Sequence, residues 1–374
     1  MFEKLSLDAL EHYWWFIIAL LAGLFSFIIF VQGGQVLLNT LAKNEEEKDL
    51  LVNALGRKWE LSFTSLTVFG GALFAAFPLF YSVSFGGAYY AWMAILFCFV
   101  ILAVSYEYRK KPNNFLGQKV YEAFLYINGS IGIILIGIAL GTLFSGGHFV
   151  RDSFNTAHWT NKWYGLEAVI NLFNVTLGLT LFFLARVNAN LYFIKMIDEA
   201  NIVKRAFKEL KIDAALFLLF FLIMLALLLT MTGVSETANG FVKEPYKFLH
   251  NFLQEPILLG AFLFGVLLIV WALVTAIFKQ NQNAIFYSGF GTVMSVTSLF
   301  LLLGYNHTAI YPSLSDLQSS LSLHNASSSR YTLLVMSYVS LLVPFVLGYI
   351  YLVWKSMDKE KLTIQEIEAD SHHY

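Results

Sequence analysis

Long apolar stretches separated by short polar segments recur along the whole chain. A helix that crosses a bilayer needs about 20 predominantly apolar residues, and nine stretches meet this requirement. The pattern predicts an all-α membrane protein with nine transmembrane helices. We expect one polytopic membrane domain over residues 1–374, arranged as two four-helix bundles plus one peripheral helix. The expected spans are residues 13–42, 62–83, 87–107, 121–146, 163–186, 212–233, 256–278, 284–305 and 332–354.

The distribution of positive charge predicts how these helices are oriented. Cytoplasmic segments of membrane proteins are enriched in Lys and Arg. If the N-terminus lies outside, in the periplasm, 18 of the 24 Lys and Arg residues fall in cytoplasmic segments. With eight or ten spans this alternation would break partway along the chain. We therefore expect a periplasmic N-terminus and a cytoplasmic C-terminus.

The composition agrees with a membrane location and narrows the possible partners. Apolar residues make up 58% of the chain. Charged residues make up 13%, well below the share in a soluble domain. The formal net charge of −1 gives no support for nucleic acid as a partner. The single cysteine, Cys98, lies in an apolar run, which excludes an internal disulfide and a cysteine-rich metal site.

Candidate ligands for a metal or cofactor are scarce. The middle of each predicted span contains no Asp, Glu, Lys, Arg or His, so we expect ionisable residues only near the ends of the spans. A haem in the membrane needs an axial His, Met or Cys directed into a helix bundle. Each of the eight histidines falls in a loop, a tail or the edge of a span. We therefore expect no catalytic residue, no cofactor and no metal ion on this chain itself.

One polar pair precedes the second predicted span. Trp59 and Glu60 stand at its cytoplasmic end, and the run Gly-Gly-Ala-Leu-Phe-Ala-Ala-Phe-Pro follows at residues 70–78. One interpretation is structural: Trp59 anchors at the membrane interface, and Glu60 favours the positive N-terminal end of the helix. The other is functional: Glu60 is a carboxylate at the mouth of a proton path.

The block from Trp59 to Pro78 resembles subunit II of the cytochrome bd-type quinol oxidases. The similarity runs along nearly the whole chain and is concentrated in residues 49–112 and 320–357. The other matching segments follow in the same order as in that family. They are Trp14-Trp15 at the start of the first span, Tyr106-Glu107-Tyr108-Arg109 at the end of the third, the polar stretch 320–330 and Val343-Pro344 in the ninth.

The resemblance implies a nine-helix subunit of an oxidoreductase in the bacterial inner (plasma) membrane. The complex would oxidise quinol and reduce dioxygen to water in the aerobic respiratory chain. It would include a larger partner, subunit I, which would hold two b-type haems, haem d and the quinol site. This chain would support the assembly of subunit I and line a route for protons or dioxygen. A small single-span subunit and membrane lipid are further expected partners.

The chain departs from the family at three acidic positions. Gln32 and Gln35 stand where family members carry Asp at the end of the first span, and Asn325 replaces an Asp before the ninth. An amide can hold water molecules, but its side chain has no ionisable proton at physiological pH. If a proton route passes through this chain, Glu60 and Glu107 are its remaining acids, and Trp59 lies beside the first of them.

A stand-alone polytopic transporter or channel is the alternative function. Such a protein needs a polar pathway across the membrane. The candidates for lining that pathway are Gln32, Gln35, Asn128, Asn171 and Asn174. The two hypotheses predict different results on purification. An oxidase subunit purifies with a coloured haem-bearing subunit, whereas a transporter purifies alone.

Overall fold

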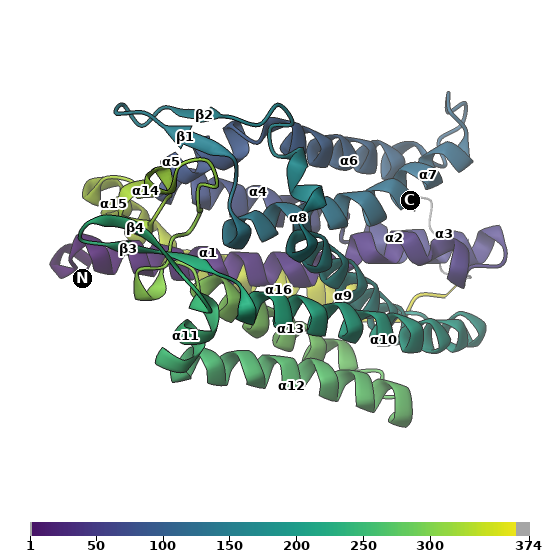
Figure 1. Cartoon of the computed structure of the whole chain (residues 1–374). Helices are drawn as coiled ribbons and strands as arrows, with labels where there is room; N and C mark the ends of the chain where they lie inside the picture. Colours follow the sequence, from purple (N-terminus) through teal and green to yellow (C-terminus); the bar gives the residue numbers. More distant parts are fainter. Residues whose placement is uncertain (1, 364–374) are drawn as a thin grey trace.

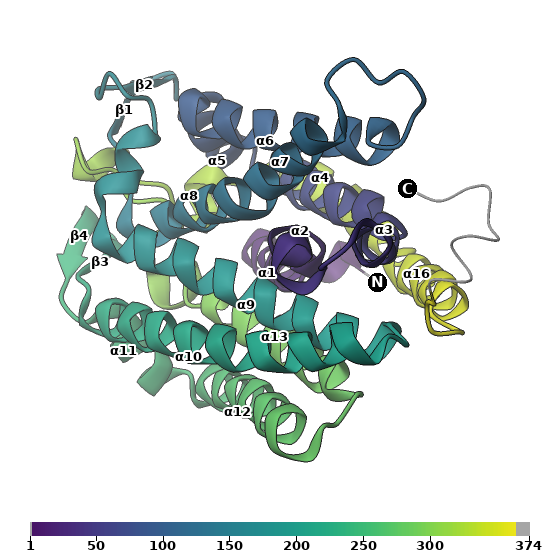
Figure 2. The same ribbon diagram turned by 90° about the vertical axis from the view of Figure 1, so that its right-hand side faces the viewer.

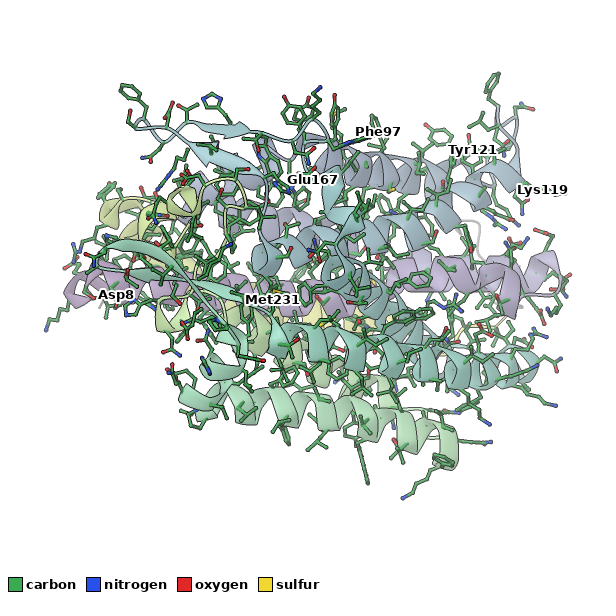
Figure 3. The ribbon with its side chains drawn as sticks, viewed as in Figure 1. Asp8, Phe97, Lys119, Tyr121, Glu167 and Met231 are labelled. Atoms are coloured by element: carbon green, nitrogen blue, oxygen red, sulfur yellow. The ribbon has the colours of Figure 1, made fainter. Side chains whose placement is uncertain are left out.

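The structure is a computed structural model that describes residues 2–363. Its long helices run roughly along one common axis (Figure 1). Two β-hairpins and the start of the first helix lie at one end, called here the hairpin end. Helix α3 (Glu45–Gly56) lies at the other, called here the α3 end. Asp8 and Lys119 mark these two ends (Figure 3).

Eight helical segments among the described residues are long and apolar enough to cross a membrane. Three of them are interrupted helices, and the other five are single α-helices. The interrupted ones are α1 (Leu7–Ile28) with α2 (Phe30–Leu41), α7 (Gln118–Ile127) with α8 (Ile133–Ser145), and α15 (Arg330–Ser340) with α16 (Val343–Met357). The single ones are α6 (Tyr89–Tyr108), α9 (Leu172–Met196), α10 (Ala200–Thr230), α12 (Pro256–Lys279) and α13 (Ala284–Leu301).

The expected second span, residues 62–83, folds differently from the other eight. It consists of α4 (Trp59–Ala76), the single turn α5 (Pro78–Tyr81) and the π-helical turn η2 (Ser82–Gly86). Pro78 lacks a backbone N–H and starts α5 at its first turn, which separates α5 from α4. Helix α4 is also less apolar than the eight candidate spans because Glu60, four hydroxyl residues and two glycines lie in its 18 residues.

Helices α9 and α10 do not start at the residues where the fifth and sixth spans were expected to start. Helix α9 begins at Leu172 and not at residue 163, because the preceding chain forms a 3-10 turn, η4 (Leu166–Ile170). The Asn171 side chain then caps α9 by accepting hydrogen bonds from the N–H groups of Phe173 and Asn174. Helix α10 begins at Ala200, 12 residues before the expected start.

The longer α9 and α10 also enclose two ionisable residues. Arg186 lies inside α9 and Asp213 lies inside α10, and both had been expected at the ends of spans. The Arg186 Nε donates to Asp213 Oδ1 at 2.7 Å, and Arg186 Nη2 donates to Glu209 Oε1 at 2.8 Å. Each charged side chain is paired with an opposite charge. The helices can therefore continue past the residues at which the hydropathy pattern predicted the end of the span.

The helices pack around α1, α2 and α9. Figure 2 shows α2 at the centre of the view from the α3 end, with α16 at the periphery. Helix α1 packs against α4 and α13, and α9 packs against α2, α8 and α10. The backbones of α2 and α9 approach closely, since a Cβ on Gly33 would lie 2.4 Å from the Ala185 carbonyl carbon. Small residues permit such approaches between membrane helices.

Short elements close the hairpin end and were not expected from the sequence. Strands β1 (Phe149–Arg151) and β2 (Ala157–Trp159) pair antiparallel, with Phe149 opposite Trp159. Strands β3 (Gly233–Thr237) and β4 (Gly240–Glu244) form the second hairpin. The remaining short helices of the described chain are η1 (Phe2–Lys4), α11 (Lys247–Gln254), η5 (Tyr305–His307), η6 (Leu317–Ser319) and α14 (Leu323–Ala326).

Candidate functional site

Gln32 and Gln35 lie fully buried in α2 near the α3 end, where they join a cluster of polar groups. Gln32 Nε2 donates to Ser62 Oγ at 2.6 Å, and that hydroxyl donates to the Trp59 carbonyl at 2.8 Å. Gln35 Nε2 donates to the Tyr106 hydroxyl at 3.3 Å. We call Gln32, Gln35, Trp59, Ser62 and Tyr106 the amide cluster. It links α2, α4 and α6.

A π-helical turn brings a further amide close to this cluster. The turn η3 (Asn128–Gly132) interrupts the α7–α8 helix, and Asn128 Nδ2 donates to the Cys98 carbonyl of α6 at 2.9 Å. The turn also touches α2, because a Cβ on Gly129 would lie 2.3 Å from the Gln32 carbonyl oxygen. Turns of this kind occur frequently at functional sites.

Several polar atoms of this region are buried without a hydrogen-bond partner among the described residues. They are the acceptors Gln32 Oε1, Gln35 Oε1 and Asn128 Oδ1 and the donor Trp59 Nε1. Buried polar groups of this kind are usually satisfied by ordered water. The amide cluster can therefore hold water, but its groups are uncharged and cannot store a proton.

Glu60 and Glu107 lie at the same end of the molecule but point away from the amide cluster. Both are exposed, and neither makes a hydrogen bond or an ion pair within residues 2–363. Their sequence neighbours turn inward instead: the rings of Trp59 and Tyr106 stack with centroids 5.9 Å apart. The structure thus brings Gln32, Gln35 and Trp59 together and leaves the two carboxylates on the outer face of α4 and α6.

An open groove runs along that outer face between α4 and α6, with a volume of about 510 Å³. We call it the α4–α6 groove. Its walls are apolar and include the exposed side chains of Phe63, Phe74, Met93 and Leu96. Gly71 also lines it, and a Cβ there would meet no atom within 4 Å. The groove offers space for a helix or a lipid chain against α4.

Asn325 lies at the hairpin end, far from Gln32 and Gln35 in the fold. It forms a capping box with Ser322 in α14, and its Nδ2 donates to the Ser320 carbonyl at 3.1 Å. The acid near it is Glu11, which is 1% exposed and accepts a hydrogen bond from Ser327 Oγ at 2.6 Å. Asn325 therefore has a local structural role and is not part of the amide cluster.

Sequence reasoning missed an ion network centred on Arg109 at the α3 end. The Arg109 side chain is fully buried; its Nη1 contacts Asp49 at 2.7 Å, and its Nη2 contacts Glu122 at 2.8 Å. Lys48 joins the network at 3.0 Å from Glu122. Burial alone would lower the pKa of Lys48, but hydrogen bonds to Glu122 and Glu45 raise it overall. The network ties α3 to the ends of α6 and α7.

A second buried cation holds the C-terminal helix. The Nζ of Lys58 lies 2.8 Å from Asp358 Oδ1 and 4.7 Å from the centre of the Trp354 ring. Burial lowers the pKa of Lys58, and the nearby Asp358 carboxylate offsets this only in part. Trp354 Nε1 also donates to Asp358 Oδ2. This clamp joins the start of α4 to the end of α16.

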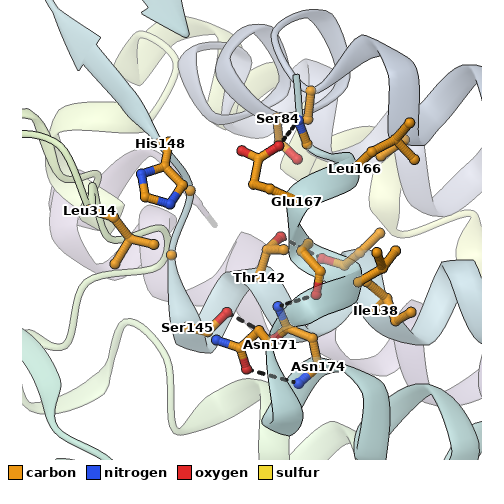
Figure 4. Close-up of a pocket in the computed structure, with 18 of the residues that line it drawn as sticks. Ser84, Ile138, Thr142, Ser145, His148, Leu166, Glu167, Asn171, Asn174 and Leu314 are labelled. Atoms are coloured by element: carbon orange, nitrogen blue, oxygen red, sulfur yellow. Dashed lines mark hydrogen bonds between the residues drawn. The ribbon is translucent and has the colours of Figure 1, made fainter. Parts of the chain in front are cut away.

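A polar cavity of about 90 Å³ lies at the hairpin end, between η2, α6, α8 and the start of α9 (Figure 4). Glu167 points into it: Oε2 accepts a hydrogen bond from the Gly165 N–H at 2.8 Å, and Oε1 is buried without a partner. Asn174 lines the floor, where its Oδ1 accepts from Ser145 Oγ at 2.8 Å. A cavity of this size and polarity has room for several water molecules.

Tyr311 closes one wall of that cavity with its fully buried ring. Burial raises the pKa of Tyr311 to about 12, although hydrogen bonds with Thr142 and Ser84 act in the opposite direction. The phenol is therefore protonated at physiological pH. Asn171, a candidate for a transport pathway, also lines the cavity, but its side chain is occupied as the cap of α9. The cavity is separate from the amide cluster, which lies at the other end.

Comparison with known proteins places the chain among oxidase subunits. Residues 10–357 match the sequence family described as "Cytochrome bd terminal oxidase subunit II". The cytochrome bd-I ubiquinol oxidase subunit 2 of Escherichia coli (strain K12) is 26% identical, over 98% of both chains. The cytochrome bd ubiquinol oxidase subunit 2 of Bacillus subtilis (strain 168) is 26% identical, over 91% of this chain and 93% of the relative.

A solved structure has the same fold. The bd oxidase from Geobacillus thermodenitrificans matches with a TM-score of 0.65, over 93% of this chain and 98% of the matched chain. The sequence identity in that match is 14%, so this likeness concerns the fold alone.

Proposed function

The chain belongs to the cytochrome bd terminal oxidase subunit II family, and from this premise we propose that it is the non-haem subunit of a quinol oxidase. The complex is an oxidoreductase of the bacterial inner membrane, which this chain crosses several times. Its substrates are quinol and dioxygen, and its main partner is the haem-bearing subunit I. A small single-span subunit stays a prediction from the resemblance.

We assign the two b-type haems and haem d to subunit I. All six histidines of the described chain support this assignment by their position. They are His12, His148, His158, His250, His307 and His324, and they lie in loops, short elements or the first turns of α1 at the hairpin end. Within residues 2–363 no group of three or more His, Cys, Asp or Glu side chains is placed to hold a metal ion.

We propose nine membrane crossings within one domain, with α4 and α5 as the ninth. The 18 residues of α4 span about 27 Å as an α-helix, close to the thickness of the hydrocarbon layer. In this arrangement the hairpin end and the N-terminus face the periplasm, and the α3 end faces the cytoplasm. Two four-helix bundles would be joined by a peripheral α15–α16, which is supported by the lack of buried residues in α16.

One observation carries the proposed function of this subunit: Glu60 and Glu107, two carboxylates without a partner among residues 2–363, lie on an apolar outer face. Glu60 precedes the groove residue Phe63 by three positions on α4, and Glu107 follows the groove residue Phe99 by eight positions on α6. Charged groups beside lipid are costly. A partner that covers this face would shield both acids from lipid. We propose that subunit I docks on α4 and α6, and that Glu60 and Glu107 then serve as proton-accepting groups at the subunit boundary.

The amide cluster has a different role in this proposal. Gln32 and Gln35 keep their neighbours hydrogen-bonded and hold water beside Trp59, but they cannot exchange a proton with that water. Protons from the cytoplasm would therefore pass along the outer carboxylates and not through α2. Trp59 connects the amide cluster to the outer carboxylates: its ring stacks on Tyr106 within the cluster, and the next residue, Glu60, is exposed on α4.

The test is the variant Glu60→Gln in the purified complex, with quinol-driven oxygen consumption and the haem spectrum both measured. We expect slower oxygen reduction with near-normal haem content, because the amide keeps the size of the side chain and removes its proton. Glu46→Gln is the matched control, since Glu46 is exposed on α3 at the same end but away from the groove. Its turnover should match the unmodified complex.

Two results would contradict the proton-accepting role. Loss of haem d in Glu60→Gln would make Glu60 a structural residue at the subunit boundary. Unchanged turnover with normal haem would exclude both roles. The stand-alone transporter is not favoured, because the family match covers residues 10–357. Purification of this chain with a coloured partner would exclude it.

A further inference from the structure

Three lysines form a ridge on the outer face of α10 near the α3 end. Lys204, Lys208 and Lys211 are all exposed and follow each other at spacings of four and three residues. Residues at these spacings stack on one side of a helix. We call this set the lysine ridge.

The ridge lysines have no partner in the described part of the chain, unlike Arg205 and Arg186. Arg205 pairs with Glu47 at 2.6 Å, and Arg186 pairs with Asp213 and Glu209 on the inner side of α10. The three lysines make no ion pair or hydrogen bond with any residue from 2 to 363. The acids closest along the chain are Glu209 and Asp213, and both are paired with Arg186. Asp198 and Glu199 precede the ridge at the N-terminal end of α10.

The same face of α10 continues as an apolar strip. Ala215, Leu219, Leu222 and Ala226 are all exposed, with Leu219 and Leu222 at 51% and 60%. These residues extend the spacing of the ridge by steps of three or four, so basic and apolar positions share one side of the helix. The opposite side is buried against the neighbouring helices through residues such as Phe217 and Met224.

Helix length places the change from basic to apolar at the membrane surface. The 31 residues of α10 are about 46 Å long, whereas the hydrocarbon layer is about 30 Å thick. The apolar part, residues 212–230, fills about 28 Å of that layer. Lys211 then stands at its edge, Lys208 about 4 Å farther out and Lys204 about 10 Å out, a range that covers the headgroup layer.

We propose that this face of α10 binds an anionic phospholipid, with the phosphate headgroup on the lysine ridge and the acyl chains along the apolar strip. An anionic headgroup is favoured by charge complementarity, because the three ridge ammonium groups lie at the depth of the lipid phosphates. The apolar strip selects a membrane lipid over a soluble anion. Lysines can also serve only to orient a helix by the positive-inside rule, and such lysines would show no preference among lipids. The experiment therefore measures lipid preference.

The experiment uses the complete oxidase complex purified in mild detergent. Co-purifying phospholipids are measured by mass spectrometry, and the melting temperature is recorded with added phosphatidylglycerol or phosphatidylcholine. The unmodified complex should retain phosphatidylglycerol and be stabilised by it more than by phosphatidylcholine. Each lysine beside an anionic surface changes binding about fivefold. The variant Lys204→Gln/Lys208→Gln/Lys211→Gln should therefore lose affinity on the order of a hundredfold.

Two further variants control the result. Lys111→Gln/Lys119→Gln/Lys359→Gln removes the same charge from three exposed lysines on separate segments and should keep the preference for phosphatidylglycerol. Lys204→Arg/Lys208→Arg/Lys211→Arg keeps the ridge charge and should also keep it. Equal stabilisation by both lipids, or undiminished phosphatidylglycerol on the triple Gln variant, would overturn the proposal. Neither readout depends on the proton-accepting role of Glu60.

Discussion

At the scale of single residues, Arg109 is the side chain on which the α3 end most depends. Its guanidinium is fully buried between the carboxylates of Asp49 and Glu122, whose side chains are 11% and 10% exposed. An arginine can serve both because its planar fork donates in two directions at once. The carboxylates in turn keep a buried cation compensated. Removal of the arginine would leave Asp49 and Glu122 with only the more exposed cations of Lys110 and Lys48.

We expect Arg109→Gln to lower the stability of this subunit within the purified complex by about 3–5 kcal/mol, the usual cost of breaking a buried ion pair. Thermal unfolding of the complex in detergent measures this change. Lys110→Gln is the control: it removes a cation from the same Asp49 carboxylate but from a side chain that is 38% exposed. Its cost should stay within about 1 kcal/mol. Equal costs for the two variants would contradict the central role of Arg109.

Glu244 makes the second hairpin sensitive to acid. Its carboxylate accepts hydrogen bonds from Ser235 at 2.7 Å, and Lys247 and His250 lie 2.9 and 3.1 Å from it. Burial acts to raise the pKa of Glu244, but these hydrogen bonds outweigh it and lower the pKa to about 2. A carboxyl group with a lowered folded-state pKa stabilises the fold above its unfolded pKa of 4.5.

The hairpin should therefore be fully stabilised near neutral pH and lose this contribution as the pH falls from about 4.5 to about 2. Limited proteolysis of residues 233–244 over this pH range measures the effect. The hairpin of Glu244→Gln should be cleaved at the same rate across this pH range, because the titrating carboxyl group is gone. A hairpin whose cleavage rate is independent of pH in the unmodified protein would show that Glu244 does not stabilise it.

The sequence predicted part of the candidate site. Gln32, Gln35 and Trp59 were singled out for separate reasons, and only the structure shows that they lie together. The ion network was not foreseen, because Asp49 and Arg109 are 60 positions apart and only packing brings them into contact. The outward direction of Glu60 and Glu107 was also hidden. Hydropathy locates a residue along a helix, but its direction depends on which neighbours the helix packs against.

At the scale of elements, the bounds of α9 and α10 show where hydropathy loses accuracy. Residues 163–171 are apolar enough to resemble a span, yet Gly165 has a φ of 95°, which ends any helix there. At the other end of α9, the polar residues Asn188 and Asn190 led the hydropathy pattern to predict a loop after residue 186. They stay helical because Asn188 Oδ1 accepts from Ser288 at 2.5 Å and Asn190 donates to Asp213 at 2.8 Å.

Helix α16 is the element whose position depends most on one contact. It has no buried residue, so apolar packing within this chain holds it weakly, and the Lys58 clamp is its main polar attachment. We expect Lys58→Met to increase amide hydrogen exchange across Val343–Met357 by tenfold or more, since it leaves Asp358 without its cation. The measurement is hydrogen exchange with mass spectrometry on the purified complex.

Lys355→Met provides the matched control for the clamp. Lys355 lies on α16 itself, is exposed and has no partner among the described residues. Its replacement should leave exchange in α16 unchanged. If both variants exchange as slowly as the unmodified protein, subunit I holds α16 in the complex and the clamp is dispensable there.

At the scale of the whole molecule, the two ends differ in chemistry. All described histidines, both hairpins and the Glu167 cavity lie at the hairpin end. The Arg109 network, the Lys58 clamp and the lysine ridge lie at the α3 end. This asymmetry agrees with the positive-inside rule if the α3 end is cytoplasmic. It also requires α4 to cross the membrane, because α3 must lie on the opposite side from η2.

Cysteine labelling tests that crossing directly. In a Cys98→Ser background the chain has no other cysteine, so Glu46→Cys and Gly86→Cys each introduce a single thiol. Both positions are exposed, and they lie on either side of α4. In intact cells, after the outer membrane is made permeable where there is one, we expect a membrane-impermeant maleimide to label Gly86→Cys. We expect it to label Glu46→Cys only after the cells are broken.

Labelling of both from the outside, or of neither, would mean that α4 does not cross and that the chain has eight spans. If neither thiol is labelled, α3 is cytoplasmic, and the lysine ridge would then lie on the opposite side of the membrane, in the periplasm.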